Sequence, residues 1–257
     1  MSEASYLSSK KERKMRRKIA AAAVLALALA AISCQKDDTL YYNNMTMGNI
    51  VDGQFISDQG NAFNVVEQSE SCIEQLDTMT RAIVICDILN AVKGTANEYD
   101  IRLNAAASVL TKSPVEKENV SDEMDAEDPI QISQLWFSGG YMNMLLKYPT
   151  SKGKDGGHSV SLVWSKGTDG EYIFELFHNA YGDIWDGASS ATNLDLNGKY
   201  MSFPVSGIIE GDSASVVIVY RWYRQAGHGW SSEIENYRIG YSWKRDEYEQ
   251  VPSGLSL

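Results

Sequence analysis

Apolar and polar positions alternate along most of the chain from residue 45 onward, which predicts β-strands. In "EYDIRLN", Tyr99, Ile101 and Leu103 share one face, while charged and amide side chains share the other. "RAIVICDILN" (81–90) is almost continuously apolar and predicts a strand buried on both faces. "FISDQGNAFNVV" places Asp58–Asn61 between two apolar stretches and predicts a hairpin. Together these patterns favour a small closed or partly closed barrel.

The second half shows the same period of two. Apolar positions alternate in "HSVSLVW", "EYIFELFHN", "SASVVIVYRWY" and "NYRIGYSW". Gly139-Gly140 interrupts the apolar run "LWFSGGYMNMLL" and predicts a bulge or a sharp bend. Roughly seven short strands separated by Gly, Asp and Asn indicate an antiparallel β-sandwich. The predicted fold class is therefore all-β, with no sustained helical periodicity.

An acidic stretch separates the two halves. Residues 112–129 hold seven acidic residues, two prolines and few large apolar groups. Such a composition buries little surface and is typical of a linker. We therefore expect a barrel domain at 45–112, a linker at 113–128, a sandwich domain at 129–248 and a tail at 249–257.

The first 33 residues resemble a bacterial lipoprotein signal. Seven basic residues lie between positions 10 and 18, and residues 19–32 form an apolar run of 14 residues. This run is too short to span a hydrocarbon core of roughly 30 Å as a helix. It leads into Ala31, Ser33 and Cys34, similar to a lipobox, although leucine is more usual at position 31. Lipidation of Cys34, followed by a tether at 34–44, is expected; a transmembrane anchor or a buried thiol is the alternative. Met15 is an alternative start of this signal.

The residues after Cys34 suggest where the protein works. Gln35, Lys36, Asp37 and Asp38 resemble the acidic signal that sends some lipoproteins to the outer face of the outer membrane. A solvated charged tether is the alternative interpretation. The expected location is the outer membrane, lipid-anchored and exposed at the cell surface.

The net charge argues against two kinds of partner. The whole chain carries a formal net charge of −11. The leader holds seven basic and two acidic residues, which leaves 16 basic and 32 acidic residues after it, a net charge of −16. Nucleic acids and anionic lipid surfaces attract basic proteins, so neither is an expected electrostatic partner.

Few residue patterns indicate chemistry. Cys72 and Cys86 either form one disulfide or pack as buried thiols. The three histidines (His158, His178 and His228) have no metal-binding spacing and are expected at strand ends, at the core edge or in solvent. Asp183, Asp186 and Asn193 could offer oxygen ligands to calcium in a loop, but their spacing matches no EF-hand, so turn capping is the favoured interpretation. No nucleophile elbow, phosphate loop or cofactor motif is present, so we expect no catalytic residues, metal or cofactor.

Aromatic residues provide the remaining candidates for binding. Exposed Trp and Tyr side chains bind sugar faces or protein surfaces. The candidates lie in two loop-rich regions: Trp185, Trp222, Tyr223 and Trp230. Alternatively, Trp222 belongs to the core by alternation and the other aromatics cover the edge of the sandwich.

Two segments carry a family resemblance. "YDIRLNAAASVLTK" (99–112) and "DPIQISQLWFSGGYMNMLLKY" (128–148) resemble the NigD-like lipoproteins of the Bacteroidota. The resemblance runs from about residue 40 to 245. Its best-marked residues are Tyr99, Ile101, Arg102, Asn104, Leu110, Lys112, Asp128, Pro129, Ile130, Trp136, Gly139, Gly140, Tyr141 and Asn143.

The resemblance implies a fold and a class of function. It implies an N-terminal OB-like barrel and a C-terminal β-sandwich, and it suggests bacteriocin immunity without an established activity. We therefore expect a non-enzymatic surface lipoprotein that binds an extracellular protein or peptide. The alternative is a glycan-binding accessory lipoprotein that uses the aromatic residues named above.

Overall fold

The computed structural model describes most of the chain after residue 44. The described residues are 45–72, 75–121, 124, 126–149, 157–184, 196–226 and 229–244, with backbone only at 196–197, 226 and 229–230. The expected signal, Cys34, the 35–38 signal, Trp185 and the tail lie outside these residues. In the part of the chain that is described, no helix is long and apolar enough to cross a membrane.

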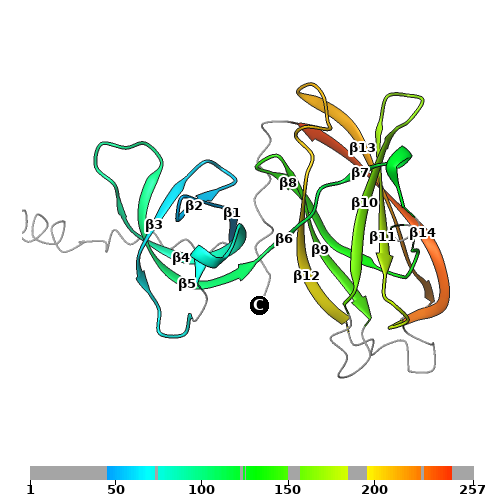
Figure 1. Ribbon diagram of the computed structural model, residues 1–257, viewed down its shortest axis with the longest axis horizontal. Coiled ribbons are helices and arrows are strands. Elements are labelled where there is room, and N and C mark those ends of the chain that lie inside the picture. The colour runs from blue at the N-terminus through cyan, green and yellow to red at the C-terminus, as the bar shows by residue number, and fades with distance from the viewer. Residues whose placement is uncertain are drawn as a thin grey trace, which may run out of the picture. The chain divides into compact units, whose positions relative to one another are not determined.

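Five strands close into a barrel with the order β1-β2-β3-β5-β4 (Figure 1). They are β1 (Thr46–Val51), β2 (Gln54–Ser57), β3 (Ala62–Gln68), β4 (Arg81–Ala91) and β5 (Glu98–Ser108). β3 and β5 are parallel, and the other neighbouring strands are antiparallel. A short 3₁₀ turn, η1 (Leu76–Thr78), precedes β4. The OB-like barrel expected from the sequence is confirmed.

Alternate apolar side chains fill the barrel. Phe63, Val84, Ile101 and Leu103 are buried in its core, as the period of two predicts. Asp58–Asn61 forms the expected hairpin, in which the Ser57 amide donates to the Asn61 carbonyl at 2.8 Å. The core of the barrel is therefore built by the pattern read from the sequence.

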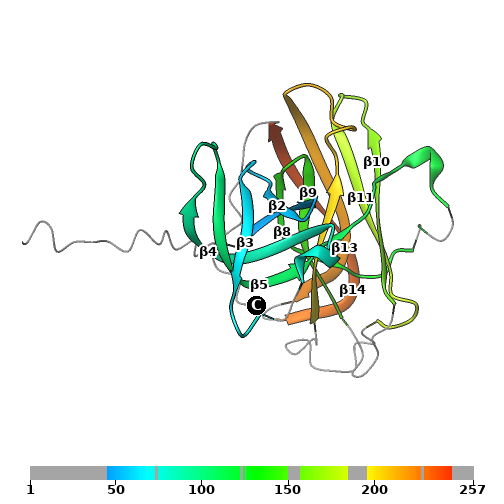
Figure 2. The same ribbon diagram turned by 60° about the vertical axis from the view of Figure 1, so that its left-hand side comes forward.

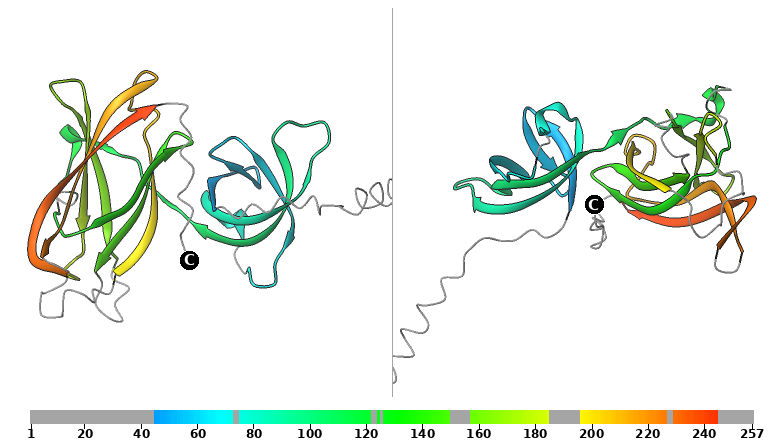
Figure 3. Two further views of the ribbon diagram at one scale, coloured as in Figure 1. Left: turned by 180° about the vertical axis from the view of Figure 1, so that it is seen from behind. Right: turned by 90° about the horizontal axis from the view of Figure 1, so that it is seen from below.

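The second half forms two packed sheets (Figure 2). One has the order β14-β13-β11-β10-β7, and the other β6-β12-β9-β8. Their strands are β6 (Leu110–Thr111), β7 (Val115–Glu116), β8 (Gln131–Ser138), β9 (Tyr141–Pro149), β10 (Ser159–Lys166), β11 (Tyr172–Asn179), β12 (Leu196–Pro204), β13 (Ser213–Ala226) and β14 (Gly229–Lys244). β13 and β14 form a long curved ribbon, orange to red in Figure 3. Large apolar residues of both sheets, among them Met144, Leu162, Phe174, Phe203 and Ile218, form the core.

The sandwich is not purely antiparallel. The longest ladders are antiparallel, but β11 pairs with β13 in parallel. The short strands β6 and β7 also pair in parallel, with β12 and β10. Gly139-Gly140, expected to be a bulge or bend, is the two-residue turn between β8 and β9, with φ angles of 57° and 83°. Two successive positive φ angles are typical of hairpin turns with glycine.

The acidic stretch is more ordered than its composition indicates. β6 joins one sheet and β7 joins the other, and the 3₁₀ turn η2 (Lys117–Asn119) follows β7. The Lys112 ammonium donates to the Val160 carbonyl at 2.8 Å. The expectation that this stretch does not order itself was therefore wrong for its first part, because backbone pairing with the sheets stabilises it. The proposed domain limits stay a prediction.

Candidate functional site

The outer face of the five-stranded sheet holds a groove where two strands diverge. The parallel pairing of β11 with β13 ends at Glu175 and Val219. Beyond this point residues 126–130 lie between the two strands. The His178 amide donates to the Ala126 carbonyl at 3.1 Å and the Asp128 amide to the His178 carbonyl at 3.0 Å, while the Ile130 amide donates to the Arg221 carbonyl at 2.8 Å. The inserted segment thus replaces the missing part of the parallel ladder.

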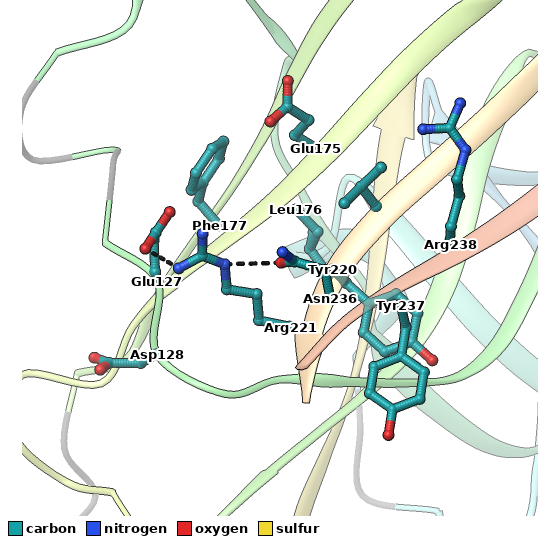
Figure 4. Close-up of a pocket in the computed structure, with 11 residues that line it drawn as sticks. Glu127, Asp128, Glu175, Leu176, Phe177, Tyr220, Arg221, Asn236, Tyr237 and Arg238 are labelled. Atoms are coloured by element: carbon teal, nitrogen blue, oxygen red, sulfur yellow. Dashed lines mark hydrogen bonds and ion pairs between the residues drawn. The ribbon is translucent and has the colours of Figure 1, made fainter. Parts of the chain in front are cut away.

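The groove encloses a volume of about 350 Å³ (Figure 4). Arg221 lies at its centre, with an ion pair to Glu127 and a hydrogen bond of 3.0 Å from its Nε to Asn236 Oδ1. Arg238 pairs with Glu171 at 3.2 Å. Phe177 adds an apolar surface beside the paired charges. The groove is therefore amphipathic, and its two arginines already have acidic partners.

A cluster of two histidines and an aspartate lies on the opposite face of β11. His158 Nδ1 is 2.9 Å from His178 Nε2, and His158 Nε2 is 3.3 Å from Asp183 Oδ2. His178 Nδ1 is 3.0 Å from the carbonyl oxygen of Pro129, in the segment that lines the groove. Tyr148 of β9 stacks on the His158 ring with centroids 4.5 Å apart. All three ionisable side chains of the cluster are buried.

Burial lowers the affinity of His178 for protons. The pKa of His178 is lowered from 6.5 to about 4, first by desolvation and then by the positive charge of His158. The two ring nitrogens of His158 face different partners, so they do not converge on one point. No group of three metal-ligating side chains is found among the described residues.

A second buried polar cluster joins the barrel to the sandwich. Arg81, the first residue of β4, donates through Nη1 and Nη2 to both carboxylate oxygens of Asp58, at 2.9 and 2.7 Å. Its other contacts are to Asn49 at 3.0 Å, Asn143 at 3.0 Å and Ser202 at 2.9 Å. Arginine has five N–H donors, and all five are used here. The guanidinium is 1% exposed, so the pair is removed from water.

The turn between β8 and β9 completes this joint. Ser138 donates to Asp58 Oδ2 at 2.6 Å, and the Tyr141 ring lies 3.9 Å from the guanidinium carbon of Arg81. A Cβ atom on Gly139 would lie 2.4 Å from Asp58 Oδ1, so only glycine fits. Beside the joint, a small apolar cluster contains Met47, Ile83, Val109 and Trp136. Several residues that carry the family resemblance therefore have a structural role at this joint.

The predicted aromatic platform is wrong in two of its four residues. Trp222 is 1% exposed and Tyr223 is 2% exposed, so neither ring can bind a ligand from solvent. The β13–β14 ribbon curves and shifts its register near Tyr223, and the adjacent rings of Trp222 and Tyr223 contact each other there. Trp185 lies outside the described residues, as does the side chain of Trp230.

The two cysteines after Cys34 are both buried in the barrel core, and the structure does not bridge them to each other. Burial and the neighbouring Asp87 carboxylate raise the pKa of the Cys86 thiol to about 11. A protonated buried thiol is unreactive. A disulfide between Cys72 and Cys86 therefore stays a prediction.

Comparison with known proteins shows which proteins this chain resembles. Residues 112–235 match the family of the NigD-like C-terminal beta sandwich domain. A NigD-like immunity protein from Bacteroides caccae has 18% identity and a TM-score of 0.52, over 79% of this chain and 97% of that one. A lipoprotein candidate from Bacteroides fragilis has 12% identity and a TM-score of 0.52, over 80% of this chain and 99% of that one.

A protein of unknown function from Bacteroides vulgatus has 17% identity and a TM-score of 0.54, over 82% of this chain and 96% of that one. At these identities the likeness shows the shared fold. None of the curated proteins compared with this chain matches it. The second half of the chain, residues 112–235, thus matches the NigD-like C-terminal beta sandwich domain.

Proposed function

We propose that the protein is a non-enzymatic lipoprotein, held at the outer membrane by acyl chains on Cys34, that binds an extracellular protein or peptide. The leader sequence and the likeness to a lipoprotein candidate support the anchor. Two or three acyl chains suffice to hold a water-soluble domain on a bilayer. Exposure at the cell surface, with residues 35–38 as its signal, is part of the same proposal.

The observation that carries the binding function is the groove on the five-stranded sheet. Its charges are arranged as ion pairs beside Phe177, and Arg221 is only about one-third exposed. A polypeptide offers the complementary set, since it has side chains of both charges, apolar groups and backbone hydrogen bonds. Arginine and aromatic residues are enriched among the residues that dominate protein–protein affinity.

Bacteriocin protection is one form of this function. The similar protein from Bacteroides caccae is a NigD-like immunity protein. A lipoprotein that captured a peptide toxin at the cell surface would lower its concentration at the membrane. The groove would then be the capture site, and the lipid anchor would place it where the toxin arrives.

Site-specific photo-crosslinking tests the groove. A benzoyl-phenylalanine at Phe177, in the groove, is compared with one at Thr168, exposed in the β10–β11 turn. In intact producing cells we expect an adduct from position 177 and none from 168. Arg221→Glu should remove the adduct, because it opposes Glu127 with a like charge. Equal adducts from both positions, or an adduct unaffected by Arg221→Glu, would contradict the proposal.

Cell fractionation tests the anchor separately. Cys34→Ser should move the protein from the membrane fraction to the soluble fraction, with loss of acyl labelling. External protease should degrade the anchored protein on intact cells. Retention of Cys34→Ser in the membrane would refute lipid anchoring, and protection from protease would refute surface exposure.

A glycan array tests the alternative function, which is glycan binding. Trp222 and Tyr223 are buried, so a glycan platform would depend on Trp185 and Trp230. Binding to immobilised glycans that is lost on Trp185→Ala and unchanged by Arg221→Glu would favour the glycan-binding function over peptide capture.

A further inference from the structure

The hydrogen bonds of the histidine cluster determine how many protons it holds. The Pro129 carbonyl can only accept, so His178 carries a proton on Nδ1. The link between His178 Nε2 and His158 Nδ1 needs a second proton, and the link between His158 Nε2 and Asp183 needs a third. Two neutral imidazoles and an ionised carboxylate supply only two protons. A fully bonded cluster therefore holds one additional proton.

We propose that the chain from Asp183 through His158 and His178 to Pro129 binds one exchangeable proton, and that its release as the pH is raised loosens the segment that lines the groove. With this proton the cluster is neutral overall, whichever group carries it. Without the proton it carries one buried negative charge. One link then has two lone pairs facing each other, which a buried site does not tolerate.

The surroundings support this assignment. Asp128, in the segment packed against His178, accepts a hydrogen bond from the Ala180 amide at 2.7 Å and raises the affinity of His178 for protons. Tyr148 from β9 covers both rings, with centroids 4.5 and 5.2 Å away. The ammonium of Lys112 contacts the Val160 carbonyl, opposite His178 in the β10–β11 ladder. Glu127 pairs backbone to backbone with His178 and points its side chain into the groove.

The coupling to the groove follows from the same bonds. After release of the proton, two imidazole protons remain for three links, so one link is lost. Loss of the link from His178 to the Pro129 carbonyl, or of the link between the rings through a shift of His178, loosens the segment, whereas loss of the link to Asp183 leaves the bonds of the segment in place. Residues 126 and 128 are hydrogen-bonded to the His178 backbone, and residues 127 and 128 line the groove. The proposal deepens the proposed function and rests on it only in naming the groove as the binding site.

Asp183→Asn is the informative variant. An amide can donate to His158 Nε2, so each of the three links keeps a proton while both imidazoles stay neutral. The variant preserves the hydrogen bonds and removes the need for the additional proton. Asp169→Asn, at an exposed turn position, is the matched control with the same change of charge.

Nitrogen NMR of the full-length protein in detergent, labelled at its three histidines, reports which ring nitrogens are protonated. In the parent protein and in Asp169→Asn, we expect the signals of His158 and His178 to change together as the pH is raised. In Asp183→Asn we expect both rings to keep a proton on Nδ1 with no coupled change. Independent changes in the parent, or the same behaviour in Asp183→Asn, would overturn the proton site.

Amide hydrogen exchange at Asp128 and Ile130 tests the coupling. At alkaline pH these amides should exchange at least tenfold faster in the parent than in Asp183→Asn at the same pH. Equal rates would overturn the regulation of the groove and leave the proton site standing. Failure of the crosslink at Phe177 would instead refute the groove as binding site without affecting the proton measurement. Should Asp183→Asn not fold, His158→Gln should hold His178 in the neutral Nδ1–H form throughout, and a pH-dependent tautomer there would overturn the proposal.

Discussion

The joint around Arg81 and the cluster around His158 are both buried polar networks, but they respond differently to protons. The five donors of Arg81 meet a carboxylate, two amides and a hydroxyl, and a guanidinium group does not lose its proton in proteins. The histidine cluster depends on a proton that solution pH can add or remove. Bonds that depend on a titrating group are suited to regulation, whereas a saturated arginine pair is suited to a fixed geometry.

The comparison also separates stability from specificity. A buried ion pair contributes little net stability over apolar residues of similar volume, because desolvation offsets the attraction. Removal of only one member of the pair is costly, since the remaining buried charge then has no opposite charge beside it. We therefore interpret the Arg81–Asp58 pair as the feature that fixes how β4 meets the sandwich, and the neighbouring apolar cluster around Trp136 as the source of binding energy.

The largest expected effect comes from Arg81→Met. The change leaves Asp58 buried and unpaired and should lower the free energy of unfolding by about 3–5 kcal/mol. Arg102→Met, in the partly exposed pair with Asp87, should cost less than about 1 kcal/mol. Adding Asp58→Asn to Arg81→Met should recover part of the loss. Denaturant unfolding measures all three, and similar effects at Arg81 and Arg102 would refute the distinction between the two pairs.

Acid should weaken the fold through His178. Its pKa is lowered to about 4 in the folded state, so the unfolded chain binds more protons between pH 6.5 and 4. The contribution of His178 to the free energy of unfolding is therefore fully present above pH 6.5. It is lost as the pH is lowered to 4, which reduces the free energy of unfolding by about 3 kcal/mol. His178→Asn should flatten the measured profile of unfolding free energy in this window, whereas His228→Gln should not. An unchanged profile in His178→Asn would show that His178 is not the titrating group.

The smallest expected difference is between two glycine substitutions, one of them in the turn at the joint. Gly139→Ala places a Cβ atom against Asp58 in addition to the strain of its positive φ. Gly170→Ala has a similar φ of 81° with open space around it. We expect about 1 kcal/mol of destabilisation at Gly170 and about 1–3 kcal/mol more at Gly139. Thermal unfolding compares the two, and equal losses would show that Asp58 can move away.

Local periodicity was enough to predict the strands and much of both cores. Ile101, Leu103, Phe174 and Leu176 are buried as their alternation indicates. Parallel pairings such as β11 with β13 were not predictable, because they join segments about 40 residues apart by backbone bonds that leave no side-chain pattern. The same reason explains the acidic stretch: composition describes average burial and not pairing with a distant strand.

The polar clusters were less accessible to sequence reasoning. Arg81 opens a run expected to be buried on both faces, so a buried charge could have been predicted there, although not its partners. His158 and His178 both follow the apolar parity of their strands, which correctly indicated the core edge. Their contact with each other and with Asp183 depends on a diagonal across β10 and β11 and on the turn after β11. Trp222 and Tyr223 show that two neighbours can both be buried where a ribbon curves.

The joint has a consequence for biosynthesis. A ribosome makes Asp58 and Arg81 well before Asn143 and Ser202, which follow up to 144 residues later. Contacts between such distant positions form late, and domains generally fold in the order in which they emerge. A newly made barrel thus displays a hydrated ion pair beside the apolar Met47 and Ile83 until the sandwich arrives. That transient surface is where a chaperone would have most reason to bind the newly made protein.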